Sequence, residues 1–259
     1  MSEGIIIKKD YEIPYIRMAS KIVAQTLEYL EPYIKPGIST LELDRIAEDF
    51  ILSKGGKPAF KGYTISDGKN ILRYNHTICA SVNEVVIHGV PSSEVILKEG
   101  DIISIDVGVI YSNYYGDAAR TYLVGQVPEI KKKLSDVTRE ALYEAIKVCR
   151  VGNRIGDISN AIYYYVKKHG FDVIRGYTGH GVGKYLHEAP PIPNYPSSSG
   201  PFLRKGMTIA IEPMVVSGNF KVRVLSDGWS VVTIDGKPSA HWEHTVLITD
   251  GEPEILSLP

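Results

Sequence analysis

Two stretches of the chain repeat each other, and both end in a carboxylate. Residues 97–106 read LKEGDIISID and residues 203–212 read LRKGMTIAIE. A leucine, a basic residue, a glycine, an isoleucine and the terminal acid coincide when 97 is aligned with 203. The match exceeds what shared strand composition produces, so it predicts a chain built from two related halves.

Histidines and further acids flank the two copies in the same order. His88 precedes the first copy and His187 precedes the second, each followed three residues later by proline. Asp117 follows the first copy as Glu243 follows the second. Each half therefore supplies one histidine and two carboxylates, which predicts a metal site across a pseudo-twofold axis.

The repeat extends into helical segments. A capping box at residues 39–42 (STLE) precedes apolar residues at helical spacing over 43–51. Apolar residues recur at the same spacing over 158–166, after Asp157. Longer helical patterns precede both segments, at about 14–33 and 128–149.

The sequence thus predicts that each half consists of two helices followed by strands. Strands that follow helices in runs indicate an α+β protein, with helices covering one face of a largely antiparallel sheet. The half-repeats span about 14–125 and 128–250, and we expect one catalytic domain over 1–259 because both halves contribute to one site.

Composition excludes several classes of protein. The net charge of −1 leaves no electrostatic footprint for nucleic acid. No run of about 18 apolar residues is present, and the first residues do not resemble a signal peptide. Two cysteines, Cys79 and Cys149, are typical of a reducing compartment. These features predict a cytoplasmic, soluble protein.

Period-two alternation decides where the carboxylates point. Asp106 shares its strand face with Ser104, and Asp117 shares its face with Ala119. Small residues also neighbour Glu212 and Glu243. A lone strand acid is most often solvated, but two repeat-related pairs on faces lined by small residues favour a shared site. Four such acids could not all stay ionised without cations.

A further histidine lies between glycines. His180 stands in TGHGVG at 178–183, where glycines let the backbone pass close to a neighbour. A nucleotide-binding loop is disfavoured because no βαβ unit follows and prolines crowd 190–193. Ser81 is the counterpart of His180 in the first half, so the histidine ligand is asymmetric.

These residues, set in IDVG, YGDAARTY, TGHGVGKYLHEAPPIPNY, AIEPM and HWEHTVLIT, resemble the type I methionine aminopeptidase family, which has the pita-bread fold. The resemblance covers the chain from Ile13 onward. Type II members carry a long insertion between the second active-site histidine and the next glutamate, whereas only 24 residues separate His187 from Glu212 here.

The resemblance implies a role for each site residue. Asp117 and Glu243 would bridge two divalent ions (Co²⁺, Mn²⁺, Fe²⁺ or Zn²⁺), Asp106 would chelate one, and His180 with Glu212 would hold the other. A hydroxide activated by both ions would attack the first peptide bond, with Glu212 relaying the proton. His187 would stabilise the oxyanion, and His88 would contact the peptide nitrogen.

The resemblance also implies a methionine pocket and a secondary site. The pocket would be lined by Phe60, Tyr63, Cys79, Leu186 and Trp229, and a monovalent cation would bind near Asn83, Val85 and Ser239. Two departures from the compact bacterial members bear on the pocket: residues 64–75 form a longer segment, and Leu186 replaces an aromatic residue. No role is expected for four packed or solvated histidines: His76, His169, His241 and His244.

Three alternatives compete with this interpretation. An Xaa-Pro peptidase shares the fold and the five ligands, but usually carries an extra N-terminal domain and a different strand after the last Gly-Met. A creatinase-like hydrolase or an inactive binding protein of the same fold should have lost metal ligands, and this chain retains all five. We expect a monomer that acts on the N-termini of nascent polypeptides at the ribosome, without contacts to nucleic acid or membrane.

Overall fold

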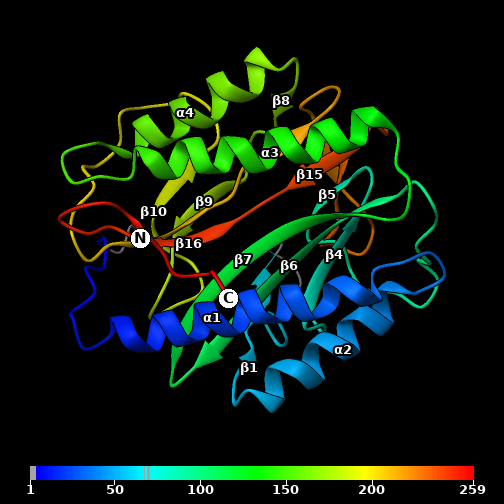
Figure 1. The fold of residues 1–259 in the computed structure, drawn as a ribbon, viewed down its shortest axis with the longest axis horizontal. Helices are drawn as coiled ribbons and strands as arrows, with labels where there is room; N and C mark the ends of the chain where they lie inside the picture. The colour runs from blue at the N-terminus through cyan, green and yellow to red at the C-terminus, as the bar shows by residue number, and fades with distance from the viewer. Residues whose placement is uncertain (1–3, 67, 69–70) are drawn as a thin grey trace.

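The computed structural model describes residues 4–66, 68 and 71–259. Two helix pairs flank a set of strands, with α1 and α2 on one side and α3 and α4 on the other (Figure 1). Every pair of strands in the described part of the chain is antiparallel. This architecture confirms the expected α+β class.

In the described residues of the first half there are two helices, a short 3₁₀ turn and seven strands. Their bounds are α1 Ile13–Leu30, the 3₁₀ turn Glu31–Tyr33, α2 Thr40–Ser53, β1 Lys57–Pro58, β2 Thr64–Ser66, β3 Ile71–Arg73, β4 Ile78–Val82, β5 Val85–Ile87, β6 Ile102–Tyr111 and β7 Tyr114–Leu123.

The second half contains two helices and ten strands. Their bounds are α3 Glu129–Lys147, α4 Ile155–Lys168, β8 Asp172–Val173, β9 Thr178–Gly181, β10 Glu188–Pro193, β11 Thr208–Ile211, β12 Met214–Val216, β13 Val222–Val224, β14 Val231–Thr233, β15 Ser239–His241, β16 His244–Leu247 and β17 Glu254–Ile255.

Local chemistry sets the helix ends. Ser39 Oγ accepts a hydrogen bond from Glu42 N at 3.1 Å, and Glu42 Oε2 accepts one from Ser39 N at 3.3 Å, so the predicted capping box is present. The α-helical part of α1 ends before Pro32, which lacks the N–H needed to extend the ladder. Helix α4 begins two residues earlier than Asp157, whose carboxylate accepts the Arg154 N–H at 2.7 Å.

Each helix pair covers its own strands with a separate apolar cluster. In the first half, Leu43 and Ile105 are among the fully buried residues that join α1 and α2 to β4, β6 and β7. In the second half, Ile158 and Ile211 belong to the cluster under α3 and α4. Because each such side chain stabilises the fold by roughly 1.5–3 kcal/mol, the apolar strand faces are held against the helices. The acids at alternate positions therefore face away from the helices.

The pairing of strands reproduces the repeat. β4, β6 and β7 of the first half are matched by β9, β11 and β16 of the second. Ser81 pairs with Ser104, and His180 pairs with Ala210, the counterpart of Ser104 at the offset of the opening repeat. Ser81 is therefore the counterpart of His180, as predicted from the sequence.

Among the described residues, no helix combines the length and the apolar character that crossing a bilayer demands.

Candidate metal centre and substrate cavity

One cavity of about 340 Å³ gathers the residues singled out in the sequence. Its lining includes all five expected metal ligands, both expected catalytic histidines and all five expected pocket residues: Asp106, Asp117, His180, Glu212, Glu243; His88, His187; Phe60, Tyr63, Cys79, Leu186 and Trp229. Polar and apolar groups from both halves of the chain thus share one space.

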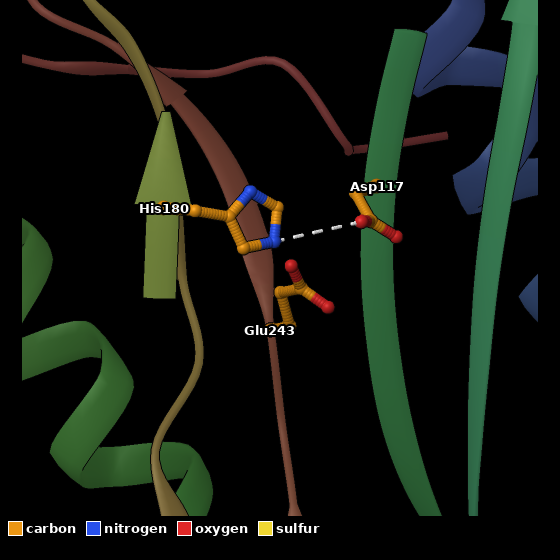
Figure 2. Close-up of side chains that lie close together, drawn as sticks. All are labelled: Asp117, His180 and Glu243. Atoms are coloured by element: carbon orange, nitrogen blue, oxygen red, sulfur yellow. Dashed lines mark ion pairs between the residues drawn. The ribbon is translucent and has the colours of Figure 1, made fainter. Parts of the chain in front are cut away.

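Three strand segments bring the central ligand candidates together. Asp117 from β7, His180 from β9 and Glu243 just before β16 each offer an atom within 4.8 Å of the others. Figure 2 shows their side chains converging, with His180 Nε2 pointing at Asp117 Oδ2 across 3.8 Å. Glu212 Oε1 lies 3.5 Å from the same nitrogen.

The glycines beside His180 are required by close backbone contact. A Cβ at position 179 would lie 2.4 Å from the Ala210 carbonyl oxygen, and one at position 181 would lie 2.5 Å from the Ala189 carbonyl oxygen. His180 Nδ1 lies 2.9 Å from Gly181 O, so the other nitrogen, Nε2, is directed into the cavity. This strand therefore requires glycine on both sides of His180.

Burial shifts the titration of the carboxyl groups. It raises the pKa of Asp106 to about 7 and that of Glu212 to about 8. The pKa values of Asp117 and Glu243 lie well above their usual range, first through burial and then through their acidic neighbours. Burial lowers the pKa of His180 to about 3, so its imidazole is neutral at physiological pH.

Unpaired buried atoms indicate that the site fits metal ions. Asp106 Oδ1, Asp117 Oδ1 and Glu243 Oε1 are buried and have no hydrogen-bond partner within the described part of the chain. Buried polar atoms are rarely left unpaired, and several such oxygens in one cluster fit cations. Carboxylate oxygens with one neutral imidazole suit hard to borderline divalent ions.

The pseudo-twofold axis relates different residues from those that the sequence repeat suggests. Ala119 and Glu243 face each other across the axis and exchange backbone hydrogen bonds of 2.9 and 3.4 Å. Thr245 Oγ1 bonds the backbone of Asp117, and Thr121 Oγ1 bonds the backbone of His241. The counterpart of Asp117 is therefore His241, and that of Glu243 is Ala119. The expected equivalence of Asp117 and Glu243 was wrong by two residues, because the order of residues along the chain does not determine the register in which strands pair.

His241, for which the sequence analysis expected no role, lies beside the candidate metal centre. Its side chain is 2% exposed, and its Nε2 lies 3.4 Å from Glu212 Oε2. It is packed, as expected, but against a candidate metal ligand. Alternation along the strand could have found it, since His241 lies two residues before Glu243 and shares its face.

The turn that carries His187 is held by a buried ion pair. Lys8 Nζ pairs with Glu188 Oε2, and each side chain is 1% exposed. Glu188 Oε1 also accepts the N–H groups of Lys184 at 2.6 Å and Tyr185 at 3.0 Å. His187 is thereby presented to the cavity, where its Nδ1 lies 3.0 Å from the Tyr63 hydroxyl.

His88 reaches the cavity from the opposite half. It follows β5 in a left-handed backbone conformation with φ of 57°. Its ring lies 5.8 Å from that of Tyr177, a lining residue that the sequence analysis did not identify. Burial lowers the pKa of His88 to about 4, so the imidazole is neutral.

An apolar cluster forms the wall beside the acids. Phe60, Cys79 and Leu186 are buried in it together with Tyr74, whose hydroxyl donates to Ile78 O at 2.8 Å. The Trp229 ring meets Tyr74 edge to face at 5.1 Å. Of the longer segment 64–75, residues 67, 69 and 70 lie outside the described residues.

The three residues of the expected monovalent-cation loop lie together. Ser239 Oγ is 3.0 Å from Asn83 O and 3.1 Å from Val85 O. Lys131 Nζ donates to Asn83 Oδ1 at 2.8 Å, so a cationic side chain already lies close to this loop.

Residues 14–250 match the model of metallopeptidase family M24, and the chain belongs to this family. Its relatives include methionine aminopeptidase of Clostridium acetobutylicum, 49% identical over 98% of this chain and 99% of that protein, and methionine aminopeptidase 1 of Bacillus subtilis, 50% identical over 98% and 99%. The crystal structure of methionine aminopeptidase from Thermotoga maritima superposes with a TM-score of 0.93 at 48% identity, covering 99% of this chain and all of that one.

A prolidase from Pyrococcus furiosus shares the fold at a greater distance. It superposes with a TM-score of 0.78 at 26% identity, and the match covers 98% of this chain but 66% of the prolidase. Among these similar proteins, the methionine aminopeptidases therefore match both the sequence and the length of this chain better than the prolidase does.

Proposed function

We propose that the protein is a methionine aminopeptidase, which removes the N-terminal methionine from peptides by metal-dependent hydrolysis of the first peptide bond. One observation carries the proposal: an apolar pocket shares one cavity with a cluster of buried carboxylates, three oxygens of which have no hydrogen-bond partner among the described residues. Membership of a metallopeptidase family supports it, as do relatives with this activity over nearly the full chain.

Asp106, Asp117, His180, Glu212 and Glu243 would hold two divalent ions. When bound, such ions polarise the scissile carbonyl and acidify the attacking water. The donor set accommodates Mn²⁺, Fe²⁺, Co²⁺ or Zn²⁺ and does not select among them.

The remaining polar groups act on the peptide and its protons. Glu212 takes the proton of the attacking water and delivers it to the leaving nitrogen. His187, oriented through the Tyr63 hydroxyl, donates to the oxygen that gains charge at the scissile carbonyl. His88, neutral and on the opposite half, contacts the peptide nitrogen beyond the scissile bond.

The apolar wall would receive the methionine side chain. Tyr63, Cys79 and Trp229 contact it, and Phe60 and Leu186 complete the pocket. A flexible thioether fills an irregular apolar space well and interacts favourably with aromatic rings. Because the carboxylate cluster lies beside this wall, a free amine is attracted to the same end of the cavity.

The cellular setting forms part of the proposal. The substrates would be nascent polypeptide N-termini, met in the cytoplasm at the ribosome, by a monomer that acts as one catalytic domain. A monovalent cation would bind at the loop formed by Asn83, Val85 and Ser239.

Hydrolysis of three peptides tests the proposal. Metal-stripped protein, reloaded with Mn²⁺ or Co²⁺, should cleave Met-Ala-Ser and leave Ala-Pro-Ala and N-acetyl-Met-Ala-Ser intact. Preference for the proline peptide would overturn the pocket assignment but not the metal chemistry. Failure to cut any peptide with both ions bound would favour a binding protein.

His187→Ala provides a test of the catalytic assignment. It should lower kcat by about a hundredfold to a thousandfold with metal content unchanged, the usual loss on removing one oxyanion donor. Measurement of kcat together with elemental analysis of bound metal checks both points. An unchanged kcat would remove His187 from the mechanism.

A further inference from the structure

The hairpin formed by β2 and β3 extends the wall of the methionine pocket toward solvent. Thr64 pairs with Arg73 and Ile65 pairs with Leu72 within the hairpin. The ladder continues inward, since Tyr74 N donates to Tyr63 O at 2.8 Å. The hairpin is therefore continuous with two residues that line the cavity.

Alternation gives the hairpin one face toward the cavity. Tyr63 and Ile65 lie on the same side of one strand, and their partners Tyr74 and Leu72 share that side of the other. Ile65 lines the cavity, whereas Ile71 belongs to the opposite face and is 77% exposed. The cavity side of the hairpin thus presents a continuous apolar surface.

A second segment faces the hairpin at the rim of the cavity. Val224, at the end of β13, lines the cavity and is 48% exposed, while Ile65 is 37% exposed. The hairpin also packs against the loop that carries Trp229, because a Cβ at position 228 would lie 2.6 Å from Leu72 Cδ1. Two partly exposed apolar side chains, Ile65 and Val224, therefore line a rim that is joined to the pocket wall.

We propose that this rim is a subsite for the side chain of the third residue of the peptide. The inference rests on the proposed function, which places the first residue against Tyr63, Cys79 and Trp229. In an extended peptide the first and third side chains lie on the same side. Since Ile65 follows Tyr63 on the same face of the hairpin, the third side chain reaches the rim, and an apolar one is favoured there.

Peptides that differ only at the third residue test the subsite. We expect kcat/KM of the Mn²⁺-loaded protein to be about fivefold higher for Met-Ala-Leu-Ser than for Met-Ala-Ser-Ser, the effect of burying roughly 40 Å² of apolar surface. Ile65→Thr should bring this ratio to about one. Ile71→Thr is the matched control on the opposite face and should keep the fivefold ratio.

A charged variant gives a second, independent measurement. Ile65→Glu should raise kcat/KM for Met-Ala-Lys-Ser relative to Met-Ala-Leu-Ser by about tenfold over the wild-type ratio. A ratio that Ile65→Thr and Ile65→Glu both leave unchanged would overturn the subsite. Equal cleavage of the Leu and Ser peptides by wild type would also overturn it while leaving the proposed function intact, whereas failure to cleave any Met peptide would overturn both.

Discussion

On either side of the pseudo-twofold axis, β7 and the segment before β16 carry different side chains at equivalent positions. Asp117 corresponds to His241, and Ala119 corresponds to Glu243, although the backbone pairing on the two sides is the same. The backbone is thus symmetric about the axis, whereas the candidate metal ligands are not. A duplicated fold supplies matching positions, and single substitutions then decide which of them hold a ligand.

The two turns that deliver the histidines differ in the same way. Beside His88, Gly89 packs directly on β4, where a Cβ would lie 2.3 Å from Ala80 O. Its counterpart in the second half is Glu188, which is bound to Lys8. The first turn is held by backbone contact and by neutral hydrogen bonds, such as that from Val90 N to Ser230 Oγ at 3.2 Å, whereas the second is held by a buried charge pair.

Removing the carboxylate of Glu243 should have the largest effect on activity. Glu243→Ala makes the second half resemble the first at Ala119, and removes an oxygen that the first half cannot replace. Loss of metal catalysis worth several kcal/mol should lower kcat/KM for Met-Ala-Ser by about a thousandfold or more. Kinetics with elemental analysis should show fewer ions per chain, and full metal content with normal activity would contradict the assignment.

Breaking the ion pair between Lys8 and Glu188 should destabilise the protein. Lys8→Met leaves the Glu188 charge buried and unpaired, and we expect a loss of about 3–5 kcal/mol in the free energy of unfolding. Urea unfolding measures this loss. Lys9→Met is a matched control, because Lys9 is exposed and should cost less than about 0.5 kcal/mol. Similar stability for both variants would exclude a structural role for the pair.

The metal affinities of the His241→Ala and Asp117→Ala variants should differ, although the two residues occupy equivalent positions. If His241 orients Glu212 without binding an ion, its removal should weaken metal affinity by about ten- to a hundredfold. The loss for Asp117→Ala should be greater. Calorimetric titration of the metal-stripped variants with Mn²⁺ measures both affinities, and equal losses would mean that His241 is itself a ligand.

The smallest expected effect is that of pH on the melting temperature of the metal-free protein. Burial raises the pKa of Asp106 to about 7 and that of Glu212 to about 8. The folded state therefore binds protons at these two groups more tightly than the unfolded state does. Their contribution to stability is present at low pH and is lost as pH rises through those values. Between about pH 7 and 8.5, where unfolded histidines with a pKa of about 6.5 are mostly neutral, the melting temperature should fall with pH. Saturating Mn²⁺ should reverse the trend, because protons compete with metal.

Much of the molecule could be predicted from short-range patterns. The capping box at Ser39, the apolar spacing of both short helices and the alternation around Asp106 are local features, and each appears in the fold as expected. The expected metal ligands, catalytic histidines and pocket residues also line one cavity. Their assigned roles remain predictions.

What the sequence by itself determined is the two helices of each half, the strand faces that carry the acids and the gathering of acids and histidines from two related halves. These depend on spacing within a few residues, which the chain states directly. Only the tertiary structure decided that His241 is the counterpart of Asp117, that Lys8 supports the turn of His187, and that Ile65 reaches the cavity rim. Each of these contacts joins segments distant in sequence or depends on strand register, and register is set by pairing and burial across the whole fold.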